Sequence, residues 1–295
     1  MEIEIYKKQS RTTDPGKYKE VLNDLPNSIL EIVSVVQGMV IDKDILGLYG
    51  VTLTAKQKED LDSRRMEIIL ERILNRNGQP LTQARQPEER FVGSCRDYAL
   101  VLCSILRHKG ILARLRCGFD HYFNIKSDLY DDHWVCEYWS EKDTRWKLVD
   151  ANVDTIVKEK YKISIDTLDI PRDRFIVAGE AWRMARQGEA DPDNFGVSSI
   201  DIKGLWFIRG SVVRDLAALN KVESLPWDYW GISDKAPEDF PKVDLALLDE
   251  VAHLILQADD VVKLQEAYHK TEFIMPQKIK SYSPFFGLQE VEVRN

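Results

Sequence analysis

The chain has 295 residues, enough for one large domain or two modest ones, and its 44% of hydrophobic residues can fill a sizeable core. Its net charge of -8 argues against a general nucleic-acid-binding protein. The apolar runs are too short to span a bilayer and the first residues do not resemble a signal peptide, so we expect neither a membrane protein nor a secreted one. Four cysteines without a disulfide-framework spacing favour a cytoplasmic protein with reduced thiols.

Residues 1–85 predict a mainly helical N-terminal part. Residues 1–10 alternate in polarity like a short strand, and helical stretches are expected near 15–25 and from Ser28 to Gly38. The pattern Thr54-x-x-Gln57 resembles a capping box, and the helix that it opens is expected to run to about Arg76. The inward-facing residues of that helix would be Leu61, Met66, Ile69 and Ile73. A polar, exposed connection follows at residues 79–90.

A loop that turns sharply into a buried helix is predicted from Phe91 to Leu106. Ser94 and Asp97 have the spacing of a capping box, and from Tyr98 onward nearly every position is apolar. Cys95 lies on the first turn, where free N–H groups and the helix dipole favour a thiolate, which is the nucleophilic form of cysteine. Cys95 could also be a small residue packed at a helix start, and this stretch by itself does not decide between the two interpretations.

Strands are expected after Gly110. Residues 113–117 alternate in polarity, which predicts an antiparallel strand with one wet face, and residues 118–132 are expected to form a loop. Residues 133–139 and 145–150 are rich in aromatic residues and valine, and a polar loop at 140–143 joins them into a hairpin. If Trp139 faces Thr144 in this hairpin, His133 faces Asp150, with their Cβ atoms roughly 5 Å apart.

Residues 161–295 predict a mainly helical C-terminal part. Helices are expected from Arg174 to Gln187, from about Asp201 to Lys221, and from Pro241 to Ile255, whereas residues 276–295 show no clear pattern. Because no flexible linker separates the three parts, we expect the N- and C-terminal parts to pack on the central segment as one globule.

Three blocks occur in the order cysteine, histidine, aspartate. They are Gly93-Ser94-Cys95-Arg96-Asp97-Tyr98, Asp132-His133-Trp134-Val135, and Arg145-Trp146-x-Leu148-Val149-Asp150. Together they resemble the transglutaminase-like superfamily over about residues 85–155. The resemblance implies an α+β fold with a papain-like core at residues 86–160, in which the nucleophile helix packs on an antiparallel sheet. It also implies a catalytic triad of Cys95, His133 and Asp150.

The function that this resemblance implies is thiol acyl transfer on an amide, either a glutamine side chain or a peptide bond, through a cysteine thioester. An alternative is a cysteine peptidase or amidase with water as acceptor, and another is a non-catalytic scaffold that binds proteins. The expected partner is a protein or peptide substrate, with no nucleic acid, membrane or cofactor. The acceptor, the second oxyanion donor and the oligomeric state are left open.

Other candidate sites are weaker. The cysteines lack the close pairs of a structural zinc site, and Asp191-Pro192-Asp193-Asn194 lacks the remaining ligand spacing of an EF-hand, so we expect no metal. His121 has no patterned carboxylate partner and is a poor candidate for the base.

Overall fold

The computed structural model describes residues 2–123, 128–236, 239 and 245–293, and it divides into two compact units. Unit 1 comprises Met1–Ile3, Arg116–Trp134 and Pro171–Asn295, and unit 2 comprises Glu4–Leu115 and Val135–Ile170. Neither unit is a continuous stretch of sequence. The predicted boundaries, a core at 86–160 between helical parts at 1–85 and 161–295, stay a prediction.

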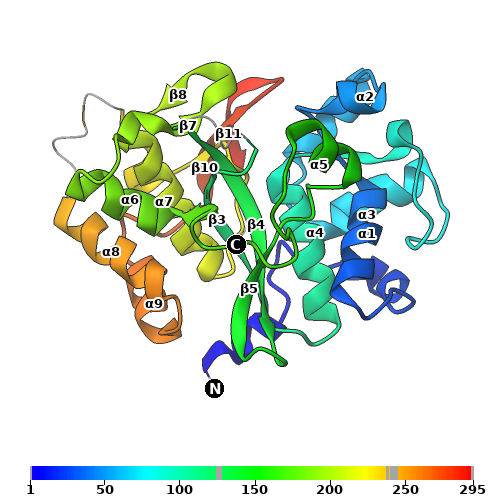
Figure 1. Cartoon of the computed structure of the whole chain (residues 1–295), viewed down its shortest axis with the longest axis horizontal. Coiled ribbons are helices and arrows are strands. Elements are labelled where there is room, and N and C mark those ends of the chain that lie inside the picture. Colours follow the sequence, from blue (N-terminus) through cyan, green and yellow to red (C-terminus); the bar gives the residue numbers. More distant parts are fainter. Residues whose placement is uncertain (1, 124–127, 237–238, 240–244, 294–295) are drawn as a thin grey trace. The chain divides into compact units, whose positions relative to one another are not determined.

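Unit 2 holds most of the N-terminal helices (Figure 1). Its α-helices are α1 (Ile29–Met39), α2 (Ala55–Lys58), α3 (Met66–Arg76), α4 (Cys95–His108) and α5 (Thr155–Tyr161). The parallel strands β1 (Val40–Asp42) and β2 (Phe91–Gly93) form a small sheet of their own. Helix α1 begins where predicted, because the Ser28 hydroxyl accepts a hydrogen bond from the Glu31 N–H.

Helix α4 is the centre of unit 2. Every residue from Arg96 to Arg107 is buried, so the prediction of a helix without a wet face is confirmed. The Cys103 thiol of α4 hydrogen-bonds the Cys136 thiol of the sheet, which places the helix directly against the strands. A helix packed on a mixed sheet, with further helices around it, confirms the predicted α+β class.

The main sheet has six strands. They are β3 (Ala113–Asp120), β4 (Tyr130–Ser140), β5 (Arg145–Val149), β6 (Phe175–Val177), β7 (Phe195–Val197) and β8 (Ile202–Lys203). The strand order is β6-β3-β4-β7-β8, and β5 pairs with β4 outside this path. The predicted antiparallel sheet was wrong in this detail: the sheet is mixed, because β4 and β7 run parallel whereas the β4–β5, β3–β6 and β7–β8 pairs are antiparallel. Both β3 and β4 pass from one unit into the other.

Unit 1 contains the C-terminal helices, which Figure 1 draws in green to orange. They are α6 (Ala178–Gln187), α7 (Leu205–Leu219), α8 (Leu245–Gln257) and α9 (Val261–Tyr268). Helix α7 is buried from Phe207 to Leu219 and shares an apolar core with α6, α8 and α9. The predicted helix from Pro241 is therefore seen from Leu245 onward, and its first four residues lie outside the described part of the chain.

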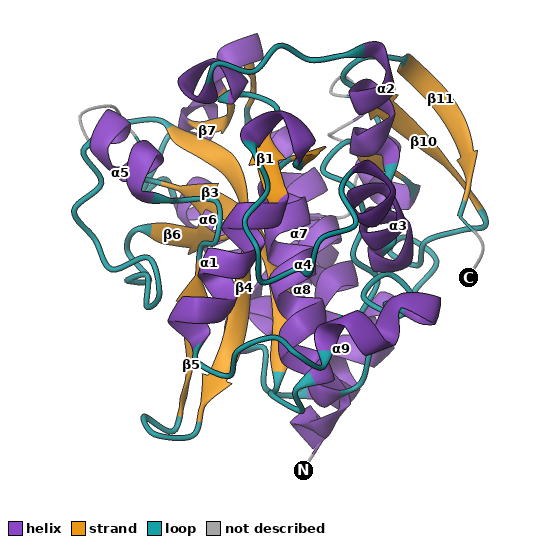
Figure 2. Ribbon diagram, turned by 90° about the vertical axis from the view of Figure 1, so that its right-hand side faces the viewer, coloured by secondary structure: helices purple, strands orange, loops and turns teal. Residues whose placement is uncertain are grey.

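The C-terminal tail forms a hairpin that the sequence did not predict. Strands β10 (Lys278–Ser283) and β11 (Gly287–Glu292) pair in antiparallel fashion (Figure 2). Strand β10 also pairs with β9 (Asp228–Tyr229). The signal was present as alternation in β10, whose side chains are exposed and buried in turn.

Two predictions for the N-terminal part were wrong in detail. Residues Glu2–Lys7 form a 3-10 helix rather than a strand. The helix expected from Thr54 to Arg76 is divided into α2, a 3-10 turn at Glu59–Asp62, and α3. The division falls at residues 63–65, because the buried Arg96 guanidinium donates to the Arg64 carbonyl oxygen at 2.8 Å, which withdraws that oxygen from a helical hydrogen bond. The predicted capping box of Thr54 and Gln57 and the inward-facing residues are confirmed.

Strand β3 is buried on both faces, so the predicted wet face was wrong. The alternating charged residues that suggested exposure are Arg114 and Arg116. The Arg114 Nε lies 2.6 Å from Glu137 and the Arg116 Nη2 lies 2.9 Å from Asp215, so each guanidinium is buried together with a carboxylate. The strand also extends to Asp120 and β4 begins at Tyr130, which shortens the loop predicted at residues 118–132; residues 124–127 lie outside the described part.

Candidate active site

Cys95 is the first residue of α4, as predicted. The Asp97 carboxylate accepts the Ser94 backbone N–H at 2.9 Å, which completes the capping box. Gly93 is required here because a Cβ atom at this position would lie 2.8 Å from the Asp97 Cβ. The Cys95 side chain is partly exposed and stands at the positive end of the helix dipole, where a thiolate is favoured.

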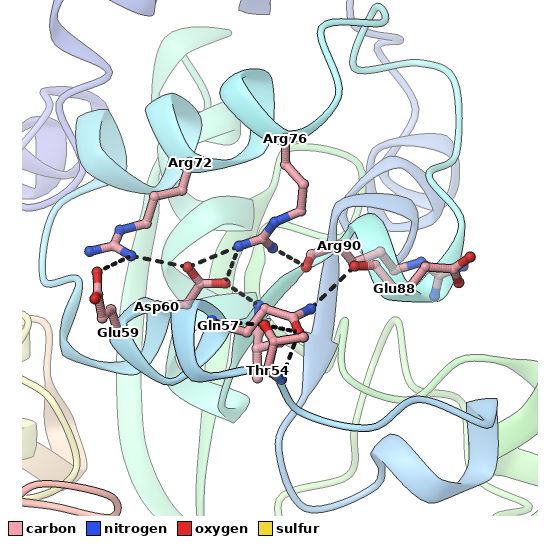
Figure 3. Close-up of polar contacts among 9 residues, drawn as sticks. Thr54, Gln57, Glu59, Asp60, Arg72, Arg76, Glu88 and Arg90 are labelled. Carbon is pink, nitrogen blue, oxygen red and sulfur yellow. Dashed lines mark hydrogen bonds and ion pairs between the residues drawn. The ribbon is translucent and has the colours of Figure 1, made fainter.

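The segment that leads into Cys95 is held by a buried carboxylate, Asp60 (Figure 3). It accepts the Val92 N–H of β2 at 3.0 Å, and it also binds the guanidinium groups of Arg72 at 3.2 Å and Arg76 at 2.9 Å. Because β2 ends two residues before Cys95, these bonds fix the backbone from which the nucleophile helix starts.

The other three cysteines are fully buried, and all four lie in the described part of the chain. Burial raises the pKa of the Cys117 thiol well above its usual value. Burial also raises the pKa of the Cys136 thiol, and its hydrogen bond with Cys103 raises it further. Both groups are therefore held as poorly reactive thiols, which distinguishes them from Cys95.

His133 lies in β4 and is only 4% exposed. Three rings surround its imidazole edge-on within unit 1: Tyr122 at 6.0 Å, Phe123 at 5.6 Å and Phe175 at 6.4 Å between centroids. Such rings keep water from the imidazole and fix its plane. The sequence did not predict this enclosure, although it showed the aromatic residues before the hairpin. His121 instead stacks on Tyr130, with 4.5 Å between the ring centroids.

Asp150 directly follows β5 and is 1% exposed. Its Oδ1 accepts the Asn152 N–H at 2.8 Å, and its own backbone N–H donates to the Thr167 carbonyl oxygen at 2.9 Å. The carboxylate is therefore held in a tight local turn of the kind that aspartate side chains stabilise.

The predicted pairing of His133 with Asp150 was wrong. In the β4–β5 ladder Trp139 faces Trp146 and Cys136 faces Val149, which is two residues away from the expected register. The loop contains residues 141–144 rather than 140–143, because Ser140 and Arg145 close the ladder and Thr144 takes a left-handed conformation with φ of 49°. A shift of two residues keeps the same side chains on the same face, whereas a shift of one would have reversed them.

The three predicted triad residues fall in different units. Cys95 and Asp150 belong to unit 2 and His133 to unit 1. The local surroundings of each residue are described above for its own unit, and a contact among the three side chains is a proposal.

A buried carboxyl that the sequence did not single out lies beside the segment that leads into Cys95, within unit 2. Asp42 ends β1 and pairs with Gly93, two residues before Cys95. The pKa of Asp42 is raised to about 6, mainly by burial and also by the neighbouring carboxylate of Asp44, while the Lys43 charge and hydrogen bonds from Asp44 and Asn152 limit the rise. A raised folded-state pKa means that the folded protein binds this proton more tightly than the unfolded chain does.

This pKa predicts a pH dependence of stability. The Asp42 contribution is fully present below its ordinary pKa of 3.8 and is lost as the pH rises through about 6, so its share of the unfolding free energy falls by about 3 kcal/mol across this window. We expect Asp42→Asn to remove this slope, as measured by urea unfolding between pH 4 and pH 7. An unchanged slope in the variant would show that other groups cause it.

The described residues contain neither a metal-binding cluster nor a membrane-spanning helix. No group of three or more His, Cys, Asp or Glu side chains in this part of the chain is arranged to hold a metal ion. No helix among the described segments has the length and hydropathy needed to cross a membrane.

Comparison with protein families identifies the central segment. Residues 62–151 match the family described as "Transglutaminase-like superfamily". This segment is a transglutaminase-like superfamily domain. The match contains α3, β2, α4 and the β3–β5 strands, so the resemblance seen in the three sequence blocks and the predicted core are confirmed. The matched segment also includes α3, whereas the predicted boundaries of the core stay a prediction.

A search of curated proteins found no match to the chain. Among solved structures, one similar chain is described as "a Putative Cysteine Protease from Cytophaga hutchinsonii", with 17% identity and a TM-score of 0.34. The alignment covers 59% of this chain and 44% of that one, so the chain spans less than half the length of the structure it matches.

Proposed function

We propose that the protein is a thiol acyl-transfer enzyme that acts on an amide, a glutamine side chain or a peptide bond, through a thioester on Cys95. The observation that carries the proposal is the contrast among the cysteines of a transglutaminase-like domain. Cys95 is partly exposed at a helix start, whereas Cys103, Cys117 and Cys136 are buried. His133 is proposed as the general acid and base, and Asp150 as the group that orients it.

The proposed reaction has two steps. The Cys95 thiolate attacks the amide carbonyl carbon, the C–N bond breaks, and the His133 imidazolium gives its proton to the leaving nitrogen. An amine then attacks the thioester, loses a proton to His133, and releases the thiolate with a new amide. The Cys95 backbone N–H is the proposed donor to the oxyanion, since N–H groups at a helix start have no helical partner.

The buried position of His133 supports its role. The surrounding rings of Tyr122, Phe123 and Phe175 limit the access of water to the imidazole, which favours an amine over water as acceptor. The proposed substrate is a protein or peptide, the proposed compartment is the cytoplasm, and no cofactor is needed for these steps.

Incubation with a glutamine-containing peptide and a labelled primary amine tests the proposal. Incorporation of the amine at the glutamine, with one equivalent of ammonia released, is the expected result. Release of ammonia or a free acid without incorporation would replace acyl transfer by hydrolysis. If neither product forms with a peptide library and Cys95 is not acylated, the protein is a scaffold.

Selective alkylation tests the state of Cys95 without a substrate. At pH 6 we expect iodoacetamide to modify Cys95 at least about tenfold faster than the three buried cysteines, because its partial exposure and its place at a helix start, which favours a thiolate, both raise its rate. Peptide mapping by mass spectrometry gives the four rates. His133→Ala is expected to slow the modification of Cys95, and equal rates at all four cysteines would contradict the assignment.

A further inference from the structure

Asp42 and Asn152 connect the start of the nucleophile helix to the turn that holds Asp150. The Asn152 Nδ2 donates to the Asp42 Oδ2 at 3.0 Å, and the Asn152 backbone N–H donates to the Asp150 Oδ1 at 2.8 Å. Asn152 therefore binds Asp42 with its side chain and Asp150 with its backbone. All three residues are buried and belong to unit 2.

Asp42 is itself fixed to the backbone before Cys95. It pairs with Gly93 in the parallel β1–β2 ladder, and the next residue, Lys43, donates its N–H to the Gly93 carbonyl oxygen at 2.9 Å. The second carboxylate oxygen of Asp42 accepts the Asp44 N–H at 2.8 Å, which holds its side chain in one orientation. The position of the Asp150 turn is thus tied to the same strand pair that leads into Cys95.

We infer that Asp42 and Asn152 form a positioning pair that holds the Asp150 carboxylate at the distance and angle needed to orient His133 in acyl transfer. This inference rests on the proposed function for the role of Asp150. Neither Asp42 nor Asn152 touches the reacting atoms, so both act through Asp150.

The Asn152 amide has one further property that makes the pair testable. Its Oδ1 is buried and has no hydrogen-bond partner in the described structure. If the Asn152 amide group rotates by 180°, its Oδ1 takes the place of Nδ2 opposite residue 42. The two residues then keep a hydrogen bond even when residue 42 is replaced by one that donates. Donor and acceptor can therefore be exchanged between the two positions without a change in size.

The charged state of Asp42 matters because its surroundings are poor in positive charge. Within its own turn it faces Lys43 and Asp44, and the hydroxyls of Tyr98 on α4 and of Tyr49 on the 3-10 turn Leu46–Tyr49 also lie within electrostatic range. The Tyr49 hydroxyl donates a hydrogen bond to the Asp154 carboxylate, and the Arg90 guanidinium lies over the Tyr49 ring. A second carboxylate placed at residue 152 would therefore repel Asp42 at neutral pH and share a proton with it in acid.

The experiment compares Asn152→Asp with the exchanged pair Asp42→Asn/Asn152→Asp. Relative to wild type at the same pH, Asn152→Asp is expected to lower kcat about 10- to 100-fold at pH 8 with KM within about twofold, because a displaced carboxylate affects the transition state and not substrate binding. At pH 5, where the two carboxyls share a proton, the deficit is expected to shrink to about threefold. The exchanged pair is expected to recover to within about threefold of wild type at both pH values.

A control and a second readout separate this inference from the proposed function. Tyr49→Phe removes the 2.7 Å hydrogen bond to Asp154 on the same segment but leaves Asp42 and Asn152 unchanged, and we expect kcat within about twofold. Amide hydrogen exchange at residue 152 is expected to accelerate at pH 8 in Asn152→Asp and to return to the wild-type rate in the exchanged pair. If the wild type shows no acyl transfer, the proposed function fails, and the hydrogen-exchange rates at residue 152 alone test whether Asp42 and Asn152 hold the Asp150 turn. A normal pH profile and exchange rate in Asn152→Asp, or no recovery in the exchanged pair, would overturn the inference.

Discussion

Replacement of Cys95 by alanine is expected to abolish acylation and to reduce amine incorporation at least about 10³-fold. The thiol is the proposed nucleophile, and the residual rate of an enzyme that lacks its nucleophile comes from binding and oxyanion donors alone. The measurement is the rate of labelled-amine incorporation, together with the intact mass of the protein after incubation with substrate. Wild type is expected to gain the mass of the acyl group and Cys95→Ala is not.

A second cysteine provides the matched control. Cys103→Ala removes a thiol from the same helix, two turns further into the core, and it is expected to cost about 1 kcal/mol of stability while the incorporation rate stays within about twofold. Substantial activity in Cys95→Ala, or loss of acylation in a folded Cys103→Ala, would contradict the choice of nucleophile.

Replacement of Asp60 by alanine is expected to lower the free energy of unfolding by about 3–5 kcal/mol. The carboxylate is fully buried and binds Arg72, Arg76 and the Val92 N–H, so its removal takes the shared buried acceptor from two guanidinium groups and one backbone donor (Figure 3). Urea unfolding followed by circular dichroism measures this loss. Because the Val92 bond fixes the strand before Cys95, the variant is also expected to lose activity below its unfolding midpoint.

The adjacent acidic residue serves as the control for Asp60. The side chain of Glu59 is 62% exposed and lies 3.8 Å from Arg72, and surface ion pairs of this kind contribute little. Glu59→Ala is expected to change the unfolding free energy by less than about 0.5 kcal/mol. Similar losses in the two variants would show that burial does not determine the importance of Asp60.

The features that sequence predicted best are those determined by neighbouring residues. The caps at Ser28, Thr54 and Ser94 and the end of the helix at Arg76 depend on residues a few positions apart, and the structure contains all of them. The continuous apolar stretch of α4 also predicted correctly that this helix is buried. These local signals were sufficient to place Cys95 at a helix start and Cys103 in the buried part of the same helix.

The features that sequence missed depend on distant partners. Arg114 and Arg116 suggested an exposed face because the sequence does not show that Glu137 and Asp215 neutralise them in the core. The hairpin register was wrong by two residues because the loop lies one residue later than predicted, at 141–144, and moving a loop by one residue changes both strands of each cross-strand pair. Asp42 lies about 50 residues before Cys95, and only the parallel pairing of β1 with β2 brings its backbone to the nucleophile loop.

The division of the chain has a consequence for how the protein is made. The boundary between the units is crossed four times, after residues 3, 115, 134 and 170, so unit 2 is complete only when residue 170 has been synthesised. Residues 116–134 leave the ribosome long before α8 and α9, with which they share unit 1. Until residue 215 has been synthesised, Arg116 lacks the carboxylate of Asp215 that it pairs with in the folded protein. A premature stop near residue 200 would therefore release a chain in which this strand has no partner for its charge and is exposed to chaperones and aggregation.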